Sequence, residues 1–202
     1  MDYKEETLKV YDSHSDYFNK KFEEYVREFI KDEINEIEKT FPRNSKILDL
    51  GSGTGNHAFV FKQKNHDVLC LDISEKMLNK CKEKGLKTIK MDIEKLSLPK
   101  NSFDVVLAYT SLLHLPKSNV PKVIESIKEM LKDNGLFFIS LKEGEGEGFE
   151  EFKEGGKRWF SLYRDDEIKK LLTQNFEIIK RWQVPINKEK KFLDYLCRKE
   201  LP

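Results

Sequence analysis

The chain has 202 residues, a length that fits one domain better than two. It is 38% hydrophobic and 36% charged with a formal net charge of +1, so no overall field attracts nucleic acid or an anionic membrane. Three scattered cysteines, Cys70, Cys81 and Cys197, argue against a disulfide framework or a zinc site. The charged N-terminus is unlike a signal peptide, and no apolar run approaches the ~20 residues of a membrane span, so we expect a cytoplasmic protein.

The first long pattern in the chain is helical. Apolar residues recur at spacings of three and four between residues 15 and 41, with Glu and Lys between them, and Pro42 follows. This spacing places the apolar side chains on one face of a helix, and proline disfavours helix in the residue before it. The sequence therefore predicts one amphipathic helix over 15–41.

Strand and helix patterns alternate from residue 46 onward. Short apolar runs predict strands over 46–50, 67–72, 87–92, 103–109 and 136–141. Helices are predicted over 56–64, 74–84 and 120–131, and Ser74 is the expected N-cap of the second. This alternation favours an α/β fold, in which helices cover both faces of a parallel sheet.

The last part of the chain changes character. A helix is predicted over 165–173, followed by two strands over 177–184 and 192–199 with a short turn at 185–189. Strands joined by a short turn run antiparallel. The tail therefore predicts antiparallel pairing at one edge of the sheet.

Three glycines follow the first predicted strand in the segment D-L-G-S-G-T-G, at residues 51, 53 and 55. Such a loop brings backbone N–H groups to the carboxyl edge of the sheet, where α/β folds bind ligands. Asn56 and His57 stand where a P-loop needs Gly-Lys, and Asn56 stands where the dinucleotide fingerprint needs its third glycine. Neither phosphate motif fits, and a plain turn remains the alternative for these glycines.

The glycine loop resembles motif I of the class I S-adenosylmethionine (SAM) methyltransferases. The likeness continues in "MDIEKLSLPKNSFDVVLAYTSLLHL" (91–115) and "LKDNGLFFIS" (131–140), which are similar to the third, fourth and fifth strands of that family. It covers residues 46–141 and is closest to the small members labelled type 11. It implies a single domain over 1–202 and a three-layer Rossmann-like sandwich. The seven-stranded sheet would be mostly parallel, with one antiparallel strand near the edge.

The same resemblance implies which residues bind SAM. They are Tyr11, Asp49, Gly51, Gly53, Gly55, Asp72, Ile73, Met77, Asp92, Ile93, Ala108 and Tyr109. In the family, the acid matching Asp72 accepts from the ribose hydroxyls and the acid matching Asp92 faces the adenine. Residues 1–41 would cover the cofactor. Helix capping remains an alternative for Asp72, turn formation for Asp92 and simple packing for Tyr11.

Candidates for catalysis and acceptor binding follow the fourth and fifth strands. His114 lies where the acceptor's nucleophile should arrive, and a neutral imidazole there can take a proton, although a structural role is the alternative. Residues 142–164 are rich in glycine and glutamate and predict a mobile lid loop with little intrinsic order. Within it, Arg158, Trp159 and Tyr163 are candidates for acceptor binding, and packing on the sheet edge is the alternative.

The sequence thus predicts a SAM-dependent methyltransferase that releases S-adenosylhomocysteine. A metal is not expected, because the four histidines lack metal-ligand spacing. The absence of an added recognition domain favours a small-molecule acceptor, while tRNA and a protein or peptide remain alternatives. A non-catalytic SAM-binding partner subunit is a further alternative, disfavoured by the intact glycine loop and its acids.

Overall fold

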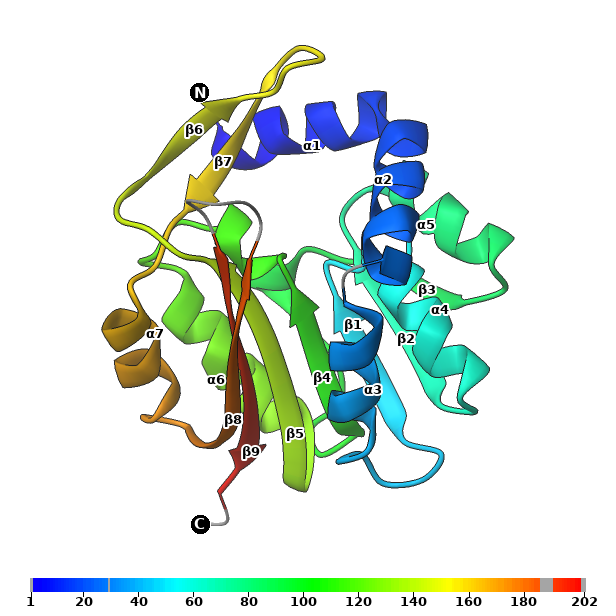
Figure 1. Ribbon diagram of the computed structural model, residues 1–202, viewed down its shortest axis with the longest axis vertical. Coiled ribbons are helices and arrows are strands. Elements are labelled where there is room, and N and C mark those ends of the chain that lie inside the picture. The colour runs from blue at the N-terminus through cyan, green and yellow to red at the C-terminus, as the bar shows by residue number, and fades with distance from the viewer. Residues whose placement is uncertain (1, 29, 186–190, 201–202) are drawn as a thin grey trace.

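The computed structural model describes residues 2–28, 30–185 and 191–200. Its centre is a seven-stranded sheet in the order β3-β2-β1-β4-β5-β9-β8 (Figure 1). The strands of this sheet are β1 (Lys46–Leu50), β2 (Asp67–Asp72), β3 (Lys87–Lys90), β4 (Phe103–Tyr109), β5 (Leu131–Lys142), β8 (Phe176–Pro185) and β9 (Lys191–Lys199). The helices are α1 (Tyr3–Ser13), α2 (Ser15–Glu28), α3 (Lys31–Glu38), α4 (Asn56–Gln63), α5 (Glu75–Glu83), α6 (Val120–Met130) and α7 (Asp165–Leu172), with short 3₁₀ turns η1 (Ile93–Lys95) and η2 (Leu112–His114).

The direction of the strands confirms the predicted topology. β1 pairs in parallel with β2 and β4, and β4 pairs in parallel with β5. β9 is antiparallel to both of its neighbours, β5 and β8, so it is the one reversed strand and lies next to the edge. The predicted turn at 185–189 lies almost wholly outside the described residues.

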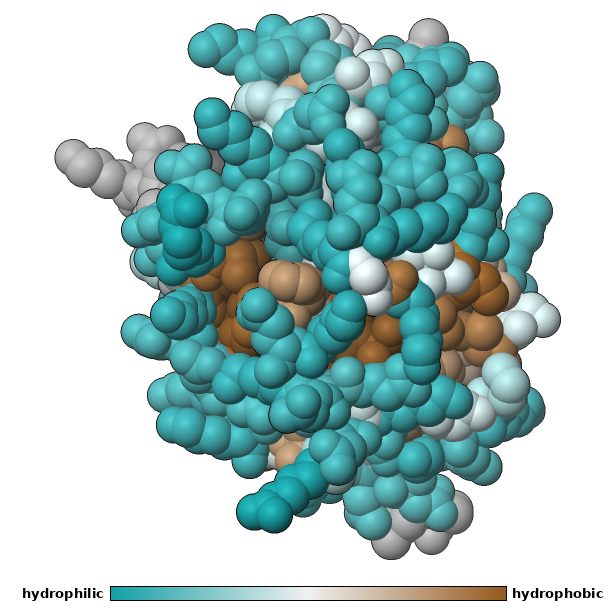
Figure 2. All heavy atoms as spheres, turned by 90° about the vertical axis from the view of Figure 1, so that its right-hand side faces the viewer, coloured by the Kyte–Doolittle hydropathy of each residue, from teal (hydrophilic) through white to brown (hydrophobic). Residues whose placement is uncertain are grey.

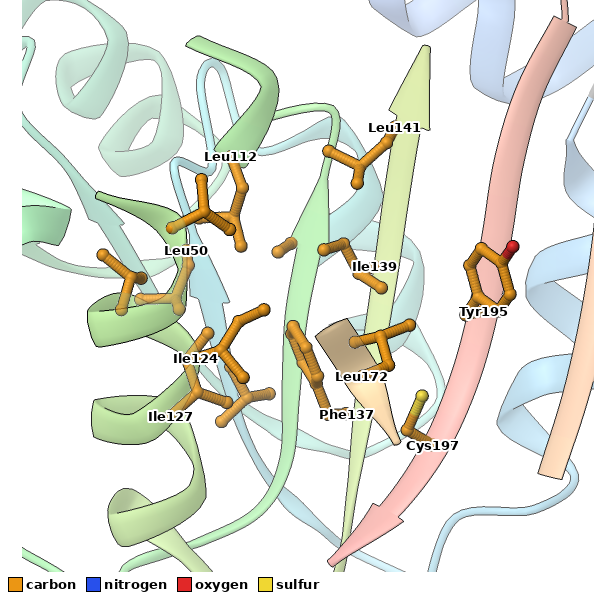
Figure 3. Close-up of a cluster of buried hydrophobic side chains, with 14 of the residues drawn as sticks. Leu50, Leu112, Ile124, Ile127, Phe137, Ile139, Leu141, Leu172, Tyr195 and Cys197 are labelled. Carbon is orange, nitrogen blue, oxygen red and sulfur yellow. The ribbon is translucent and has the colours of Figure 1, made fainter. Parts of the chain in front are cut away.

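Two apolar layers hold helices against the two faces of the sheet. Figure 3 shows one layer, in which Ile124 and Ile127 of α6 and Leu172 of α7 lie against Phe137 and Ile139 of β5. The other layer packs α3, α4 and α5 against the opposite face. On the side viewed in Figure 2, hydrophilic residues dominate and hydrophobic surface shows mainly in recesses. The three-layer sandwich is therefore as predicted.

The N-terminal prediction of one helix over 15–41 is wrong. The chain forms α2 and α3 separately, and Ile30 just before α3 has the non-helical angles φ −120° and ψ 7°. Val26, Ile30, Ile34 and Ile37 keep helical spacing across the break, so the pattern does not reveal it. α1, which was not predicted, begins at an N-cap where the Asp2 side chain accepts from the Lys4 N–H.

The prediction of a loop with little intrinsic order over 142–164 is also wrong. Two strands, β6 (Glu147–Glu151) and β7 (Lys157–Ser161), pair antiparallel and form a separate two-stranded sheet. The glycines at 155 and 156 fall in the turn, and Phe149 pairs with Trp159 across the strands, so cross-strand packing supplies order. Figure 1 shows this hairpin beside α1, across the carboxyl edge of the sheet.

Smaller differences concern where elements end. β3 stops at Lys90, and Asp92, predicted as the end of that strand, caps the 3₁₀ turn η1 instead. α6 ends at Met130, and Leu131, predicted as helical, already pairs with Phe103 as the first residue of β5. A bulge between Phe103 and Val105 interrupts that ladder. The sequence does not show such a long irregular strand because the exposed residues 132–134 and Gly135 follow Leu131 and interrupt its apolar pattern.

Candidate active site

A cavity opens at the carboxyl ends of β1, β2 and β4. Its walls include the glycine loop after β1, the segment after β4, and side chains of α1 and α2. The empty space is about 1030 Å³, including the part that is open to solvent. α1 is held over this cavity by an ion pair of 2.6 Å between Lys4 and Asp92, and Lys4 also pairs with Glu94. The site therefore lies where a parallel sheet is expected to bind a ligand.

The three positions of the loop are occupied by glycine for different structural reasons. Gly51 has φ +65°, and a Cβ there would lie 2.4 Å from the Ser111 Cβ, so the close approach of the segment after β4 requires glycine. Gly53 has φ +53°, and its missing side chain would meet nothing within 4 Å. Gly51 and Gly53 both line the cavity, whereas Gly55 packs toward Leu86 and Cys81 outside it.

Asp72 links the glycine loop to the start of α5. Its carboxylate accepts from the Gly53 N–H at 2.8 Å and from the Ser74 N–H at 2.8 Å. Burial raises the pKa of Asp72, and these backbone N–H groups oppose the rise. Ser74 is the N-cap of α5, as expected, because its hydroxyl accepts from the Met77 N–H. Asp72 thus organises the backbone and also faces the cavity.

Asp49 is a buried carboxyl group on the cavity wall. It is 2% exposed, and its Oδ2 has no hydrogen-bond partner among the described residues. Burial raises its pKa to about 7, and the charge of Asp72 adds to the rise. A cationic group in the cavity would pair with this oxygen and keep the carboxyl ionised.

Most of the other predicted cofactor residues also line this cavity. Tyr11, Ile73, Met77, Asp92, Ile93 and Tyr109 are among them. Asp92 is already engaged, because Oδ1 accepts from the Glu94 N–H and Oδ2 pairs with Lys4. Ala108 is fully buried in the core and lies outside the lining.

Tyr11 and His114 meet across the cavity wall although 103 positions separate them. The Tyr11 hydroxyl lies 2.7 Å from the His114 Nε2, and the His114 Nδ1 lies 2.6 Å from the Trp159 carbonyl oxygen. Arg158 donates from Nη1 to the Tyr11 hydroxyl at 3.1 Å. We call these four groups the Tyr11–His114 chain. Burial lowers the pKa of His114 to about 3, so its imidazole is neutral near pH 7.

The remaining candidates for acceptor binding lie behind the cavity rather than on it. Tyr163 is 2% exposed in the main core, and the Lys117 ammonium lies 4.8 Å from the centre of its ring. Arg158 and Trp159 reach the wall only through Tyr11, His114 and α1, where the Trp159 N–H donates to the Thr7 hydroxyl.

Sequence reasoning missed two features of the site. His57 lines the cavity and stacks on Tyr109, with ring centres 4.1 Å apart, and burial lowers its pKa to about 4. The sequence offered one indication of this role, which is the position of His57 two residues after Gly55 of the glycine loop. Thr110 lines the cavity beside Tyr109, at the end of β4, where the resemblance also implies a contact with the methionine part of SAM. The missed feature there is its φ of +48°, a strained conformation for a β-branched residue that no sequence pattern indicates.

No group of three or more His, Cys, Asp or Glu residues in 2–28, 30–185 and 191–200 is arranged to hold a metal ion. No helix within those ranges is long and apolar enough to cross a membrane.

Comparisons with known proteins agree with this geometry. Residues 47–135 match the family model described as a methyltransferase domain. The phosphoethanolamine N-methyltransferase of Plasmodium falciparum is 27% identical over 188 residues, covering 85% of this chain and 66% of that protein. The sarcosine/dimethylglycine N-methyltransferase of Aphanothece halophytica is 34% identical over 111 residues, covering 50% of this chain and 39% of that protein. The chain thus spans less than two thirds of the length of each of these relatives.

Solved structures share the fold. The complex of DhpI with S-adenosylhomocysteine superposes with a TM-score of 0.75 at 19% identity, over 98% of this chain and 97% of that one. A SAM-dependent methyltransferase from Methanosarcina mazei gives a TM-score of 0.75 at 17% identity, over 82% of this chain and 97% of that one. The fold is therefore that of a Rossmann-like methyltransferase, and residues 47–135 match a methyltransferase domain. In these respects the chain is similar to the class I SAM-dependent methyltransferases, and SAM is the methyl donor of that class.

Proposed function

We propose that the protein transfers a methyl group from SAM to a small-molecule acceptor. The observation that carries the proposal is the cavity itself, in which Gly53 leaves open space beside the acids Asp49 and Asp72. SAM supplies a sulfonium-bound methyl group for in-line displacement by the acceptor. Its cationic groups suit Asp49, whose Oδ2 has no partner among the described residues, and its ribose hydroxyls suit Asp72.

The residues at the other end of the cavity support removal of a proton from the acceptor. Tyr11 can accept the proton of the acceptor's O–H or N–H while its own proton moves to the His114 Nε2, 2.7 Å away. The acceptor's lone pair then forms the new bond to carbon, and the electron pair of the broken carbon–sulfur bond stays on sulfur. The site therefore needs no further reactant.

The roof of the cavity favours a small acceptor. α1 is tied down by Lys4 at one end and by Tyr11 farther along, and β7 packs beside it through the Trp159–Thr7 hydrogen bond. A tRNA or a folded protein would have to displace these contacts, whereas a small molecule fits beneath them. Both relatives named above carry N-methyltransferase in their names, which favours an amine as the first class to test.

The test has two parts. Calorimetry should show one S-adenosylhomocysteine bound per chain, with NAD and ATP bound far more weakly. Labelled methyl transfer from SAM should then be measured with a panel of small amines, an unmethylated tRNA pool and a peptide mixture, with Tyr11→Phe as the matched inactive variant. No binding of either SAM or S-adenosylhomocysteine would contradict the cofactor. Binding without transfer to any class would favour the non-catalytic subunit.

A further inference from the structure

The direction of every hydrogen bond in the Tyr11–His114 chain is determined by its two ends. A guanidinium can only donate, so Arg158 donates to the Tyr11 oxygen. A carbonyl oxygen can only accept, so the His114 Nδ1 carries a proton and donates it to Trp159. A neutral His114 then has an unprotonated Nε2, which accepts the Tyr11 O–H. The chain has one consistent arrangement of protons.

Both determining ends come from the β6–β7 hairpin. Arg158 and Trp159 are neighbours on β7, whereas Tyr11 belongs to α1 and His114 to η2. The backbone of Trp159 is also held on its other side, because its N–H donates to the Thr7 hydroxyl of α1 at 2.9 Å. The hairpin therefore supplies the groups at both ends of the Tyr11–His114 chain.

Arg158 is held in place by aromatic rings rather than by a carboxylate. Its guanidinium lies 5.0–5.4 Å from the ring centres of Tyr11, Phe18, Phe152 and Phe160. It forms no ion pair with any carboxylate in the described ranges, and its buried Nε has no hydrogen-bond partner there. A partly desolvated cation without a counter-charge is costly, and the aromatic rings offset part of that cost. Among the described residues, the polar group that the guanidinium contacts is the Tyr11 oxygen.

We propose that Arg158 is a positioning residue that orients the Tyr11 hydroxyl toward His114 and favours negative charge on the Tyr11 oxygen. Donation by Arg158 polarises the Tyr11 O–H, which strengthens its hydrogen bond to the His114 Nε2. While the Tyr11 proton passes to His114 and before the acceptor's proton has arrived, negative charge builds on the Tyr11 oxygen, and Arg158 stabilises it. The oxygen is neutral again once it holds the acceptor's proton. Arg158 also opposes the positive charge that forms on the His114 imidazole, but more weakly because that ring is more distant and Coulomb energy falls with distance.

The role of this arrangement in catalysis rests on the proposed methyl transfer. The hydrogen bonds themselves can be tested in the protein without any ligand. Nitrogen-15 spectra of the unliganded protein, with the histidine rings labelled, report the tautomer of His114 and the strength of the bond at Nε2. We expect the Nδ1–H tautomer in the wild type. In Arg158→Met the Nε2 resonance should move toward the position of an unbonded ring nitrogen, and Arg158→Lys, which keeps a charged donor, should restore part of the shift.

Lys157→Met provides the matched control, because Lys157 is the preceding cation of the hairpin and lies over Phe149, away from the chain. It should leave the His114 resonances unchanged. Tyr11→Phe removes the donor itself and should give the full shift even if Arg158→Met folds poorly. An Nε2–H tautomer in the wild type, or the same Nε2 resonance in the wild type and in Arg158→Met, would overturn the assignment. Failure of methyl transfer alone would leave these spectra unaffected and would count against the proposed function instead.

Discussion

The two ends of the cavity are built in different ways. At the glycine loop, the contacts of Asp72 join it to Gly53, 19 positions away, and to Ser74, 2 positions away. At the other end, 103 positions separate Tyr11 from His114 and 147 separate Arg158 from Tyr11. The first end is built within one strand-helix-strand unit, which consists of β1, the glycine loop, α4 and β2. The second exists only when α1, η2 and the hairpin pack together.

This difference predicts that changes at the first end affect binding of the cofactor, while changes at the second affect turnover. The strongest test is Gly53→Val, which we expect to abolish measurable SAM binding because the side chain would enter the open space of the cavity. Calorimetry measures the loss. Positive φ adds a folding cost of about 1–2 kcal/mol for any residue with a Cβ.

Gly146→Val is the matched control, since Gly146 also has positive φ and open space but does not line the cavity. It should lose comparable stability in thermal unfolding and retain SAM binding. Equal SAM affinity in both variants would show that Gly53 does not contact the cofactor.

The second test addresses the other end. Tyr11→Phe should lower kcat by about 10²–10⁴-fold, the usual contribution of a positioned acid or base, without a comparable change in SAM affinity. Turnover of the acceptor found by the methyl-transfer panel is measured beside calorimetry. Tyr17→Phe, at a tyrosine that is 40% exposed, is the control and should be silent. A loss of cofactor affinity in Tyr11→Phe with kcat retained would assign Tyr11 to cofactor covering alone.

The third change, Asp72→Ala, tests the ribose contact. It should weaken SAM binding by about 1.5–3 kcal/mol, the range for hydrogen bonds to a charged group. Asp67→Ala, at the opposite end of β2 and paired with Lys87 on the surface, serves as the control. Unchanged SAM affinity in a folded Asp72→Ala protein would show that this carboxylate serves only to hold the backbone of the glycine loop and of Ser74.

The fourth test uses pH. Burial raises the pKa of Asp49 to about 7, so SAM affinity should fall by up to about tenfold per unit as pH drops below that value. Stability of the unliganded protein should change in the opposite direction. Because the folded pKa lies above the unfolded value of about 3.9, the contribution is fully present at low pH and is lost as pH rises through about 7. Asp49→Asn should remove both dependences in calorimetry and chemical unfolding, and persistence of the affinity change would implicate another group.

The smallest expected effect concerns motion of the hairpin. If it acts as a lid, S-adenosylhomocysteine together with an acceptor should slow hydrogen exchange over residues 144–163, while exchange in β1 and β4 changes little. Exchange that is equally slow with and without ligands would make the hairpin a fixed wall.

The α/β class, the parallel core of the sheet and the antiparallel tail could all be predicted from the sequence. These follow from the period of apolar residues and from short connections, which are local properties. The sequence also pointed to the glycine loop with Asp49 and Asp72, because a strand and the turn after it are contiguous. His57 was within reach of the same reasoning and was overlooked.

The rest of the site depends on contacts between distant parts of the sequence. The break between α2 and α3 leaves the helical spacing intact, and the glycine-rich segment becomes ordered through Phe149 and Trp159 pairing across the hairpin. The Tyr11–His114 chain joins residues more than a hundred positions apart, and its hydrogen bonds depend on distances of 2.6–3.1 Å that no local pattern encodes. Long-range packing sets such distances, because the position of each element depends on the apolar face that it buries and, for α1, on polar contacts to residues far away in the sequence.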